Sequence, residues 1–146
     1  MKKTHNSLVA RLICIISMFV ALATLPTEAQ VYRNAQNSYM GKIERDGTIR
    51  DANNSRIGKI ESDGTVRNAN NSRVGKIESD GTIRDKNNSR IGRVDSDGTV
   101  RDGNNSRIGK VDSDGTIRNA NNSRIGSAPG VEKRWAAIIF FTDILK

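Results

Sequence analysis

One 17-residue unit occurs five times in succession, and this repeat constrains the fold more than any other feature of the chain. The second copy reads GKIESDGTVRNANNSRV and the fifth reads GKVDSDGTIRNANNSRI. Each copy begins at a glycine, and a sixth start follows the fifth copy: Gly41, Gly58, Gly75, Gly92, Gly109 and Gly126. So short and strict a period indicates a repeat architecture, because a single unit is too small to bury its own apolar face.

Each copy has the pattern of a β-hairpin. In the second copy, the segments around Ile60 and Val66 flank an Asp-Gly pair, which is a strong hairpin signal. A three-residue turn over 62–64 places Ile60 opposite Val66, whereas a two-residue turn would mix apolar and charged side chains on each face. We therefore predict the three-residue turn, with Gly64 in the left-handed conformation. The same aliphatic pair recurs as Ile43 with Ile49, Ile77 with Ile83, Val94 with Val100, and Val111 with Ile117.

A further aliphatic residue precedes each repeat glycine, as Ile57 precedes Gly58. Its position is out of phase with the face that carries Ile60. We infer that the strand bulges at the glycine, so that this aliphatic side chain packs between neighbouring units. The Asn-Asn-Ser stretch then connects one hairpin to the next through side-chain hydrogen bonds to the backbone.

The array begins and ends with parts of a repeat. Residues 30–40 read QVYRNAQNSYM and match the second half of a copy, and the array stops at Ile125-Gly126, the first part of one. A unit split between the two ends suits a ring. We predict an all-β fold, a closed radial array of five β-hairpins resembling a propeller-like flower, over residues 30–126. A short β-solenoid and a six-petal ring remain alternatives.

The fixed offsets of Gly, Asp-Gly-Thr and Asn-Asn-Ser resemble those of the five-fold beta-flower proteins, small secreted bacterial proteins of uncharacterised function. The resemblance extends from about Val31 to the C-terminus and includes the array GKIESDGTVRNANNSRV and the apolar tail. It implies a ring of five hairpins. It brings no catalytic or binding residue to this chain.

The first 29 residues have the features of a secretory signal peptide. Lys2 and Lys3 precede an apolar run over 12–25, and a small-residue site ends at Ala29. The apolar run is shorter than the roughly 20 residues of a spanning helix. We predict cleavage after Ala29, no transmembrane span in the mature chain, and a secreted or periplasmic location.

Catalysis has little support in the composition. His5 and Cys14 are the only histidine and the only cysteine, and both lie in the predicted signal peptide. The remaining chain has no imidazole base and no thiol nucleophile. Its acidic residues recur in every copy, whereas an active site breaks symmetry. We predict a non-enzymatic structural or binding domain with no catalytic residue, no metal site and no cofactor.

Two sets of arginines are candidates for anion binding. The whole chain has a net charge of +8, and guanidinium groups suit acidic glycans and other polyanions. A solvated face with interleaved acids is the simpler interpretation, and the lack of aromatics in the repeats argues against nucleic acid. The first set shares the outer hairpin face with acids, and the second ends each connection: Arg50, Arg67, Arg84, Arg101 and Arg118; Arg56, Arg73, Arg90, Arg107 and Arg124.

The C-terminal tail, residues 127–146, departs from the repeat. It contains Trp135, Phe140 and Phe141, with apolar residues at helical spacing and a stretch that also resembles a strand. We expect the tail to pack on the same domain and to supply bulk that the aliphatic ring lacks. The alternative is contact of these aromatics with a membrane surface, or with an envelope partner.

Overall fold

The computed structural model describes residues 29–146, which form twelve short strands and one helix. The predicted signal peptide lies outside the described residues, apart from Ala29. No helix in residues 29–146 is long and apolar enough to cross a membrane. The elements are β1 (Gln30–Asn34), β2 (Tyr39–Ile43), β3 (Thr48–Asp51), β4 (Arg56–Ile60), β5 (Thr65–Asn68), β6 (Arg73–Ile77), β7 (Thr82–Asp85), β8 (Arg90–Val94), β9 (Thr99–Asp102), β10 (Arg107–Val111), β11 (Thr116–Asn119), β12 (Arg124–Ser127) and α2 (Lys133–Phe141).

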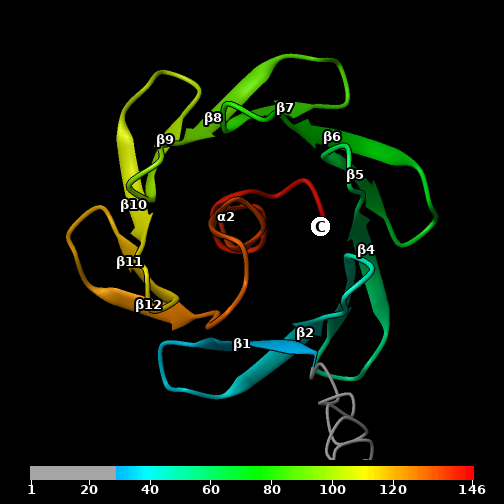
Figure 1. The fold of residues 1–146 in the computed structure, drawn as a ribbon, viewed down its shortest axis with the longest axis horizontal. Helices are drawn as coiled ribbons and strands as arrows, with labels where there is room; N and C mark the ends of the chain where they lie inside the picture. Colours follow the sequence, from blue (N-terminus) through cyan, green and yellow to red (C-terminus); the bar gives the residue numbers. More distant parts are fainter. Residues whose placement is uncertain (1–28) are drawn as a thin grey trace, which may run out of the picture.

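The strands form one closed antiparallel barrel around α2 (Figure 1). Each strand pairs with its neighbours in the sequence, and β1 pairs with β12 through Arg33 opposite Ser127 and Asn34 opposite Gly126. The two partial repeats at the ends of the array are therefore the strands that close the barrel.

The prediction of a closed radial array of five β-hairpins is wrong, and so are the alternatives of a short β-solenoid and a six-petal ring. The all-β class agrees, but the twelve strands form one continuous barrel. The Asn-Asn-Ser stretch is a tight turn between paired strands rather than a linker, so that Val66 of β5 lies opposite Gly75 of β6. Pairing on both sides of every strand leaves no open sheet edge, which explains why the continuous barrel replaces isolated hairpins.

The predicted hairpin turn and register are confirmed. Ile60 lies opposite Val66, and Gly64 has a φ of +84°. The Gly64 carbonyl also accepts a hydrogen bond from the Ile77 amide of the next repeat at 2.9 Å, so each Asp-Gly turn is joined to its neighbour. The predicted bulge beside the repeat glycine is confirmed where each hairpin pairs with the next. Val66 lies opposite Gly75 and Arg67 lies opposite Arg73, so Val74 is the extra residue.

In each Asn-Asn-Ser turn, the residue in the left-handed conformation is an asparagine, whereas in each Asp-Gly turn it is the glycine. Asn71 has a φ of +65°, which asparagine tolerates better than most residues. Its backbone amide donates to the backbone carbonyl of Asn68 at 3.0 Å.

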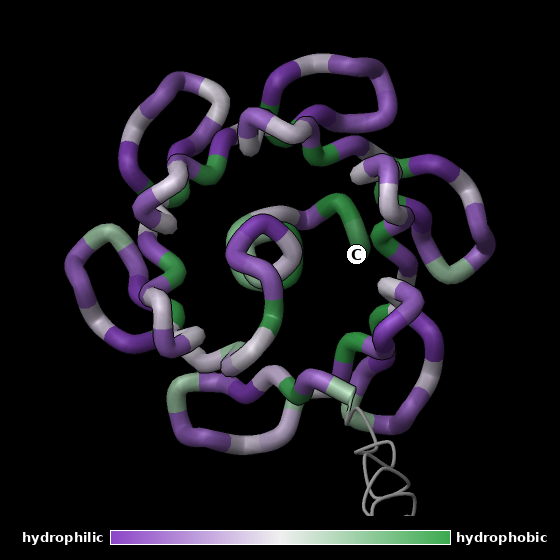
Figure 2. Tube along the Cα trace, viewed as in Figure 1, coloured by the Kyte–Doolittle hydropathy of each residue, from purple (hydrophilic) through white to green (hydrophobic). Residues whose placement is uncertain are grey.

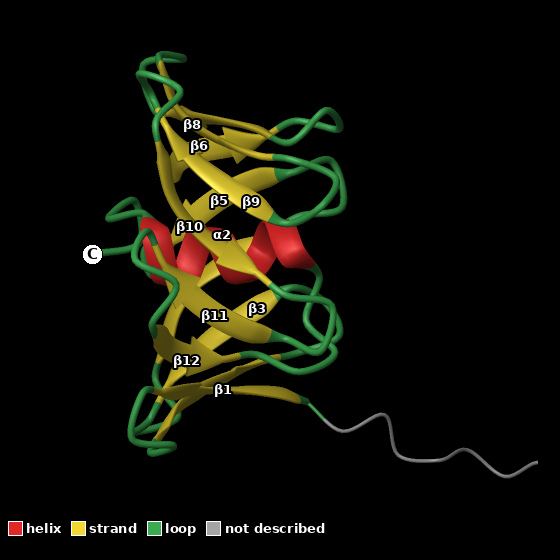
Figure 3. Cartoon of the chain, turned by 90° about the vertical axis from the view of Figure 1, so that its left-hand side faces the viewer, coloured by secondary structure: helices red, strands yellow, loops and turns green. Residues whose placement is uncertain are grey.

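Because the strands are antiparallel, the two kinds of turn lie at opposite ends of the barrel (Figure 3). We call these ends the Asp-Gly rim (44–47, 61–64, 78–81, 95–98 and 112–115) and the Asn-Asn-Ser rim (35–38, 52–55, 69–72, 86–89, 103–106 and 120–123).

The core lies between the wall and the helix. The aliphatic pairs of all five repeats point inward, and Figure 2 shows apolar residues along the inner side of the ring. Three residues of α2 are fully buried: Ala136, Ala137 and Ile138. The helix runs along the barrel axis, beginning at the Asp-Gly rim and ending toward the Asn-Asn-Ser rim (Figure 3). A helix of nine residues, too short to be stable alone in water, is thus stabilised by the surrounding sheet.

Candidate functional site

The first predicted set of arginines lies on the outer wall and is paired with acids of the same repeat. Nε of Arg67 lies 2.9 Å from Oε1 of Glu61, and Nη1 donates to the Asn71 carbonyl at 3.1 Å. The five copies share this arrangement, with distances of 2.8–2.9 Å for the ion pair. These guanidinium groups connect the hairpin to the Asn-Asn-Ser turn. The set with this role is Arg50, Arg67, Arg84, Arg101 and Arg118.

The second predicted set lies at the Asn-Asn-Ser rim and has no carboxylate partner within residues 29–146. Each guanidinium instead reaches an uncharged oxygen of the next turn around the ring. Arg73 donates to the Lys86 carbonyl at 3.4 Å, and Arg124 donates to the Ala35 carbonyl at 2.9 Å. Nε of Arg56 is buried without a hydrogen-bond partner among the described residues. The whole set is Arg56, Arg73, Arg90, Arg107 and Arg124.

The Asp-Gly rim has the opposite charge. The Asp63 carboxylate accepts the Thr65 amide at 2.8 Å and the Thr65 hydroxyl at 3.0 Å, and these hydrogen bonds lower the pKa of Asp63. The same bonds, with a smaller contribution from Lys59, lower the pKa of Asp46 from 3.8 to about 2. Every Asp-Gly turn therefore carries an ionised carboxylate at neutral pH: Asp46, Asp63, Asp80, Asp97 and Asp114.

The three tail aromatics have different surroundings. Phe140 and Phe141 are half-buried inside the barrel, where Phe140 makes an edge-to-face contact with Tyr32 at 6.3 Å between ring centroids. Tyr32 itself is buried, donates to the Arg50 carbonyl at 2.9 Å, and has a pKa raised to about 12 by that burial. Trp135 is half-buried at the Asp-Gly rim, where it borders open space between the helix and the wall.

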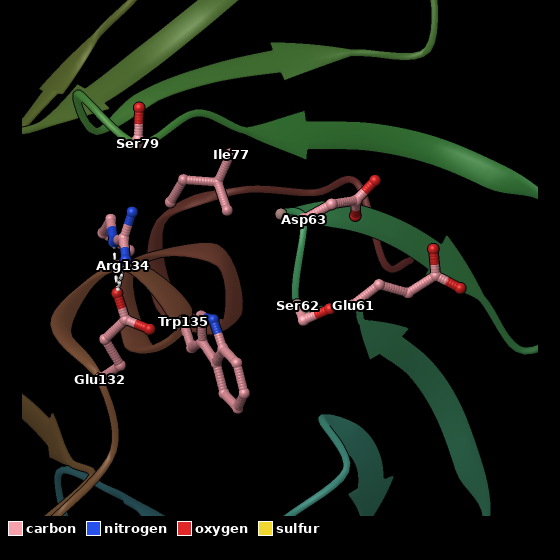
Figure 4. A pocket seen from close by; sticks show the side chains of 9 residues that line it. Glu61, Ser62, Asp63, Ile77, Ser79, Glu132, Arg134 and Trp135 are labelled. Carbon is pink, nitrogen blue, oxygen red and sulfur yellow. Dashed lines mark hydrogen bonds and ion pairs between the residues drawn. The ribbon is translucent and has the colours of Figure 1, made fainter.

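A groove separates the start of α2 from the Asp-Gly rim (Figure 4). One part of it has a volume of about 360 Å³ and is lined by Trp135, Arg134 and Glu132 from the helix region and by residues 61–64 of the wall. Trp135 also lines a second space of about 650 Å³ beside Arg45 and residues 59–63. We call these two spaces together the Trp135 groove.

Trp135 could be singled out from the sequence, but the groove could not. The groove exists because α2 lies inside the barrel with a gap to the turns, and the repeat pattern alone does not place a helix there. The signal available in the sequence was the single tryptophan of the chain, immediately after the charged residues 132–134. Within residues 29–146, no three His, Cys, Asp or Glu side chains are grouped so as to hold a metal ion.

Comparison with known proteins finds a family but no individual relative. Neither a curated protein nor a solved structure matches the chain. The model of a family described as 5-fold beta-flower protein matches residues 29–142, which include all twelve strands and α2. The match covers most of the sequence, and the chain therefore belongs to the 5-fold beta-flower protein family.

Proposed function

We propose that this protein is a non-enzymatic binding domain, exported from the cell, which binds acidic polymers such as acidic glycans through its Asn-Asn-Ser rim. The observation that carries the proposal is the difference between the two sets of arginines. The wall arginines are neutralised by acids of their own repeats, whereas the rim arginines contact only uncharged oxygens within the described residues.

The geometry of the rim favours a long ligand over a small one. An individual exposed guanidinium contributes little to binding, because solvent and salt screen its charge. The rim repeats the same group around a ring, as in Arg73, Arg90 and Arg107 of three successive copies. A polymer that carries many anionic groups can contact several of them at once, and the linked contacts add to its affinity.

The charges at the two ends of the barrel favour the Asn-Asn-Ser rim as the end that binds an anionic polymer. The Asp-Gly rim carries an ionised aspartate in each turn, which repels an anionic polymer, whereas an aspartate precedes the Asn-Asn-Ser turn in only three copies, as Asp51, Asp85 and Asp102. The wall acids are engaged with arginines, as Glu61 is with Arg67, which also argues against their use as a catalytic pair. Binding at the Asn-Asn-Ser rim is the role that these charges favour.

Retention on an immobilised acidic polysaccharide, measured as the salt concentration needed for elution, tests this proposal. We expect the triple variant Arg73→Gln, Arg90→Gln, Arg107→Gln to elute at much lower salt than the unmodified protein. The matched control is Lys59→Gln, Lys76→Gln, Lys110→Gln, which removes the same charge from the outer wall of the barrel.

The control should elute close to the unmodified protein. Equal losses in both variants would mean that only net charge matters, and no retention of the unmodified protein at low salt would exclude the proposed function. Thermal unfolding of both variants shows whether the barrel is intact.

A further inference from the structure

We propose that the Trp135 groove binds a neutral sugar ring. The groove lies at the end of the barrel opposite the proposed polymer-binding rim, and this inference does not depend on that proposal. Figure 4 shows the indole of Trp135 beside the Asp-Gly turn that contains Ser62 and Asp63, with Arg134 and Glu132 on the helix side.

The dimensions of the groove suit a small ligand. Its two parts have volumes of about 360 Å³ and about 650 Å³, and small-molecule sites typically measure roughly 300–1,000 Å³. Trp135 lines both parts of the groove, so the same indole borders both spaces. A single ring can occupy either part, and a linked pair of rings can extend from one into the other.

The lining combines a flat apolar surface with hydrogen-bonding groups. The indole is half-buried, and its Nε1–H makes no hydrogen bond to the residues that the structure describes. This N–H is not among the buried groups without a partner, so it remains accessible and can donate to a ligand in the groove. Ser62, Ser79 and Asp63 also line this part of the groove, and the serine hydroxyls can donate and accept, whereas the Asp63 carboxylate already accepts from Thr65. A pyranose has a C–H face that can stack on the indole and hydroxyls that can both donate and accept.

The charges of the groove favour a neutral ligand. Most of its ionic side chains are paired, as Glu61 is with Arg67 at 2.9 Å and Asp46 is with Lys59 at 3.3 Å. The two that form no ion pair within residues 29–146, Arg45 and Asp63, have opposite charges. Glu132 forms an ion pair with Arg134. A charged ligand would therefore compete with these ion pairs. A neutral hydroxyl group can instead form hydrogen bonds with the donor and acceptor atoms of these side chains that the ion pairs leave unused.

The wall side of the groove is preorganised. Gly64 donates to the Glu61 carbonyl at 2.9 Å, Asp63 accepts from the Thr65 amide, and the Gly64 carbonyl accepts from Ile77 of the next repeat. A turn held by these hydrogen bonds loses little freedom when a ligand binds. The site also breaks the symmetry of the repeat, because only some of the near-identical turns face Trp135.

The test is a titration of the full protein with the methyl glycosides of glucose, galactose, mannose and N-acetylglucosamine. Because Trp135 is the only tryptophan, its fluorescence and its indole N–H signal in NMR report on the groove alone. We expect at least one neutral glycoside to give a saturable change, with a dissociation constant on the order of 1 mM. No change with any of the four up to about 50 mM would overturn the proposal.

A matched pair of variants assigns the response to the groove. Arg45 occupies in the first copy the position that Ser62 and Ser113 occupy in later copies, so the turn accepts an arginine there. Ser62→Arg fills the groove and should abolish the response, whereas Ser113→Arg changes a turn that lines neither space and should preserve it. An unchanged response in Ser62→Arg, or binding of sodium glucuronate as tight as that of the neutral glycosides, would contradict the inference.

Discussion

The barrel wall presents nearly the same side chains around its whole circumference, whereas α2 and the residues after it present different side chains to different repeats. The wall repeats one inward aliphatic pair per hairpin, as in Ile60 with Val66. The tail has no internal repeat and supplies Trp135, Phe140, Phe141, Ile144 and Leu145 to the interior or its edge. A symmetric shell is thus filled by an asymmetric segment, and equivalent positions of the shell meet different neighbours.

The repeat glycines show this difference most directly. A Cβ atom on Gly109 would lie 2.2 Å from a ring carbon of Phe141, and one on Gly126 would lie 2.4 Å from a ring carbon of Phe140. Gly92 occupies the same place in its repeat, but no tail atom is among the neighbours that a Cβ there would meet. The repeat therefore provides the space for the tail at every copy, and the tail uses it at only some of them.

The largest expected effect is that of removing the tail. Deletion of residues 133–146 removes the buried Ala136, Ala137 and Ile138 and uncovers the inner face of the wall. Because single truncations of buried aliphatic residues already cost about 2–5 kcal/mol, we expect the barrel to lose cooperative unfolding altogether. Urea denaturation, followed by circular dichroism and by binding of a hydrophobic dye, measures this loss.

The matched smaller change is Ile138→Ala, which leaves the rest of the tail in place. We expect it to lower the free energy of unfolding by about 2–5 kcal/mol while keeping a single transition. A truncated protein that unfolded cooperatively at the same urea concentration as the full chain would show that the wall needs no central helix.

An intermediate loss of stability is expected to distinguish two glycines that occupy the same position in their repeats, Gly109 and Gly92. Gly109→Ala places a methyl group against the Phe141 ring, whereas Gly92→Ala meets no tail residue. Both methyl groups also approach a backbone carbonyl, at 2.4 Å from Arg118 and 2.7 Å from Arg101, so both variants lose stability. We expect Gly109→Ala to cost about 1–3 kcal/mol more, because overpacking displaces the ring. Equal urea midpoints for the two variants would contradict the assigned contact.

Much of the wall could be predicted from one repeat. The period of two in a strand and the three-residue turn fix which residues face each other, and the structure has Ile60 opposite Val66 as expected. The Asn-Asn-Ser stretch was expected only to connect one hairpin to the next, because asparagine and serine are typical of loops. In fact Asn71 in the left-handed conformation closes a tight turn, and this turn makes the hairpins into one barrel.

The site was less accessible to prediction. The sequence places Arg67 on a hairpin face shared with acids and Arg73 at the end of a connection, but only the three-dimensional arrangement shows that Arg67 pairs with Glu61 and that Arg73 contacts Lys86. The Trp135 groove depends on where the helix lies, and no periodic pattern specifies the contacts of a segment that occurs once. The sequence therefore predicts the repeated part of this molecule better than its singular part.

The smallest expected effect concerns the repeated turns and appears only in acid. Hydrogen bonds from the Thr65 amide and hydroxyl lower the pKa of Asp63, and Asp46 has a pKa of about 2 for the same reason. Because these pKa values are lower in the folded state, the turns stabilise the fold fully above the unfolded value of 3.8 and lose that contribution as the pH falls toward 2. We expect the urea midpoint to fall across this range, and Asp63→Asn to reduce the slope slightly.

The dependence on salt distinguishes the turns from the ion pairs of the wall. The main cause of the lowered pKa values is a hydrogen bond from a backbone amide, which salt does not screen, rather than a nearby cation. The fall in the urea midpoint should therefore occur at nearly the same pH at low and high ionic strength. If salt moved or removed it, screened charge–charge interactions, and not the hydrogen bonds of the Asp-Gly turns, would be the source of the acid sensitivity.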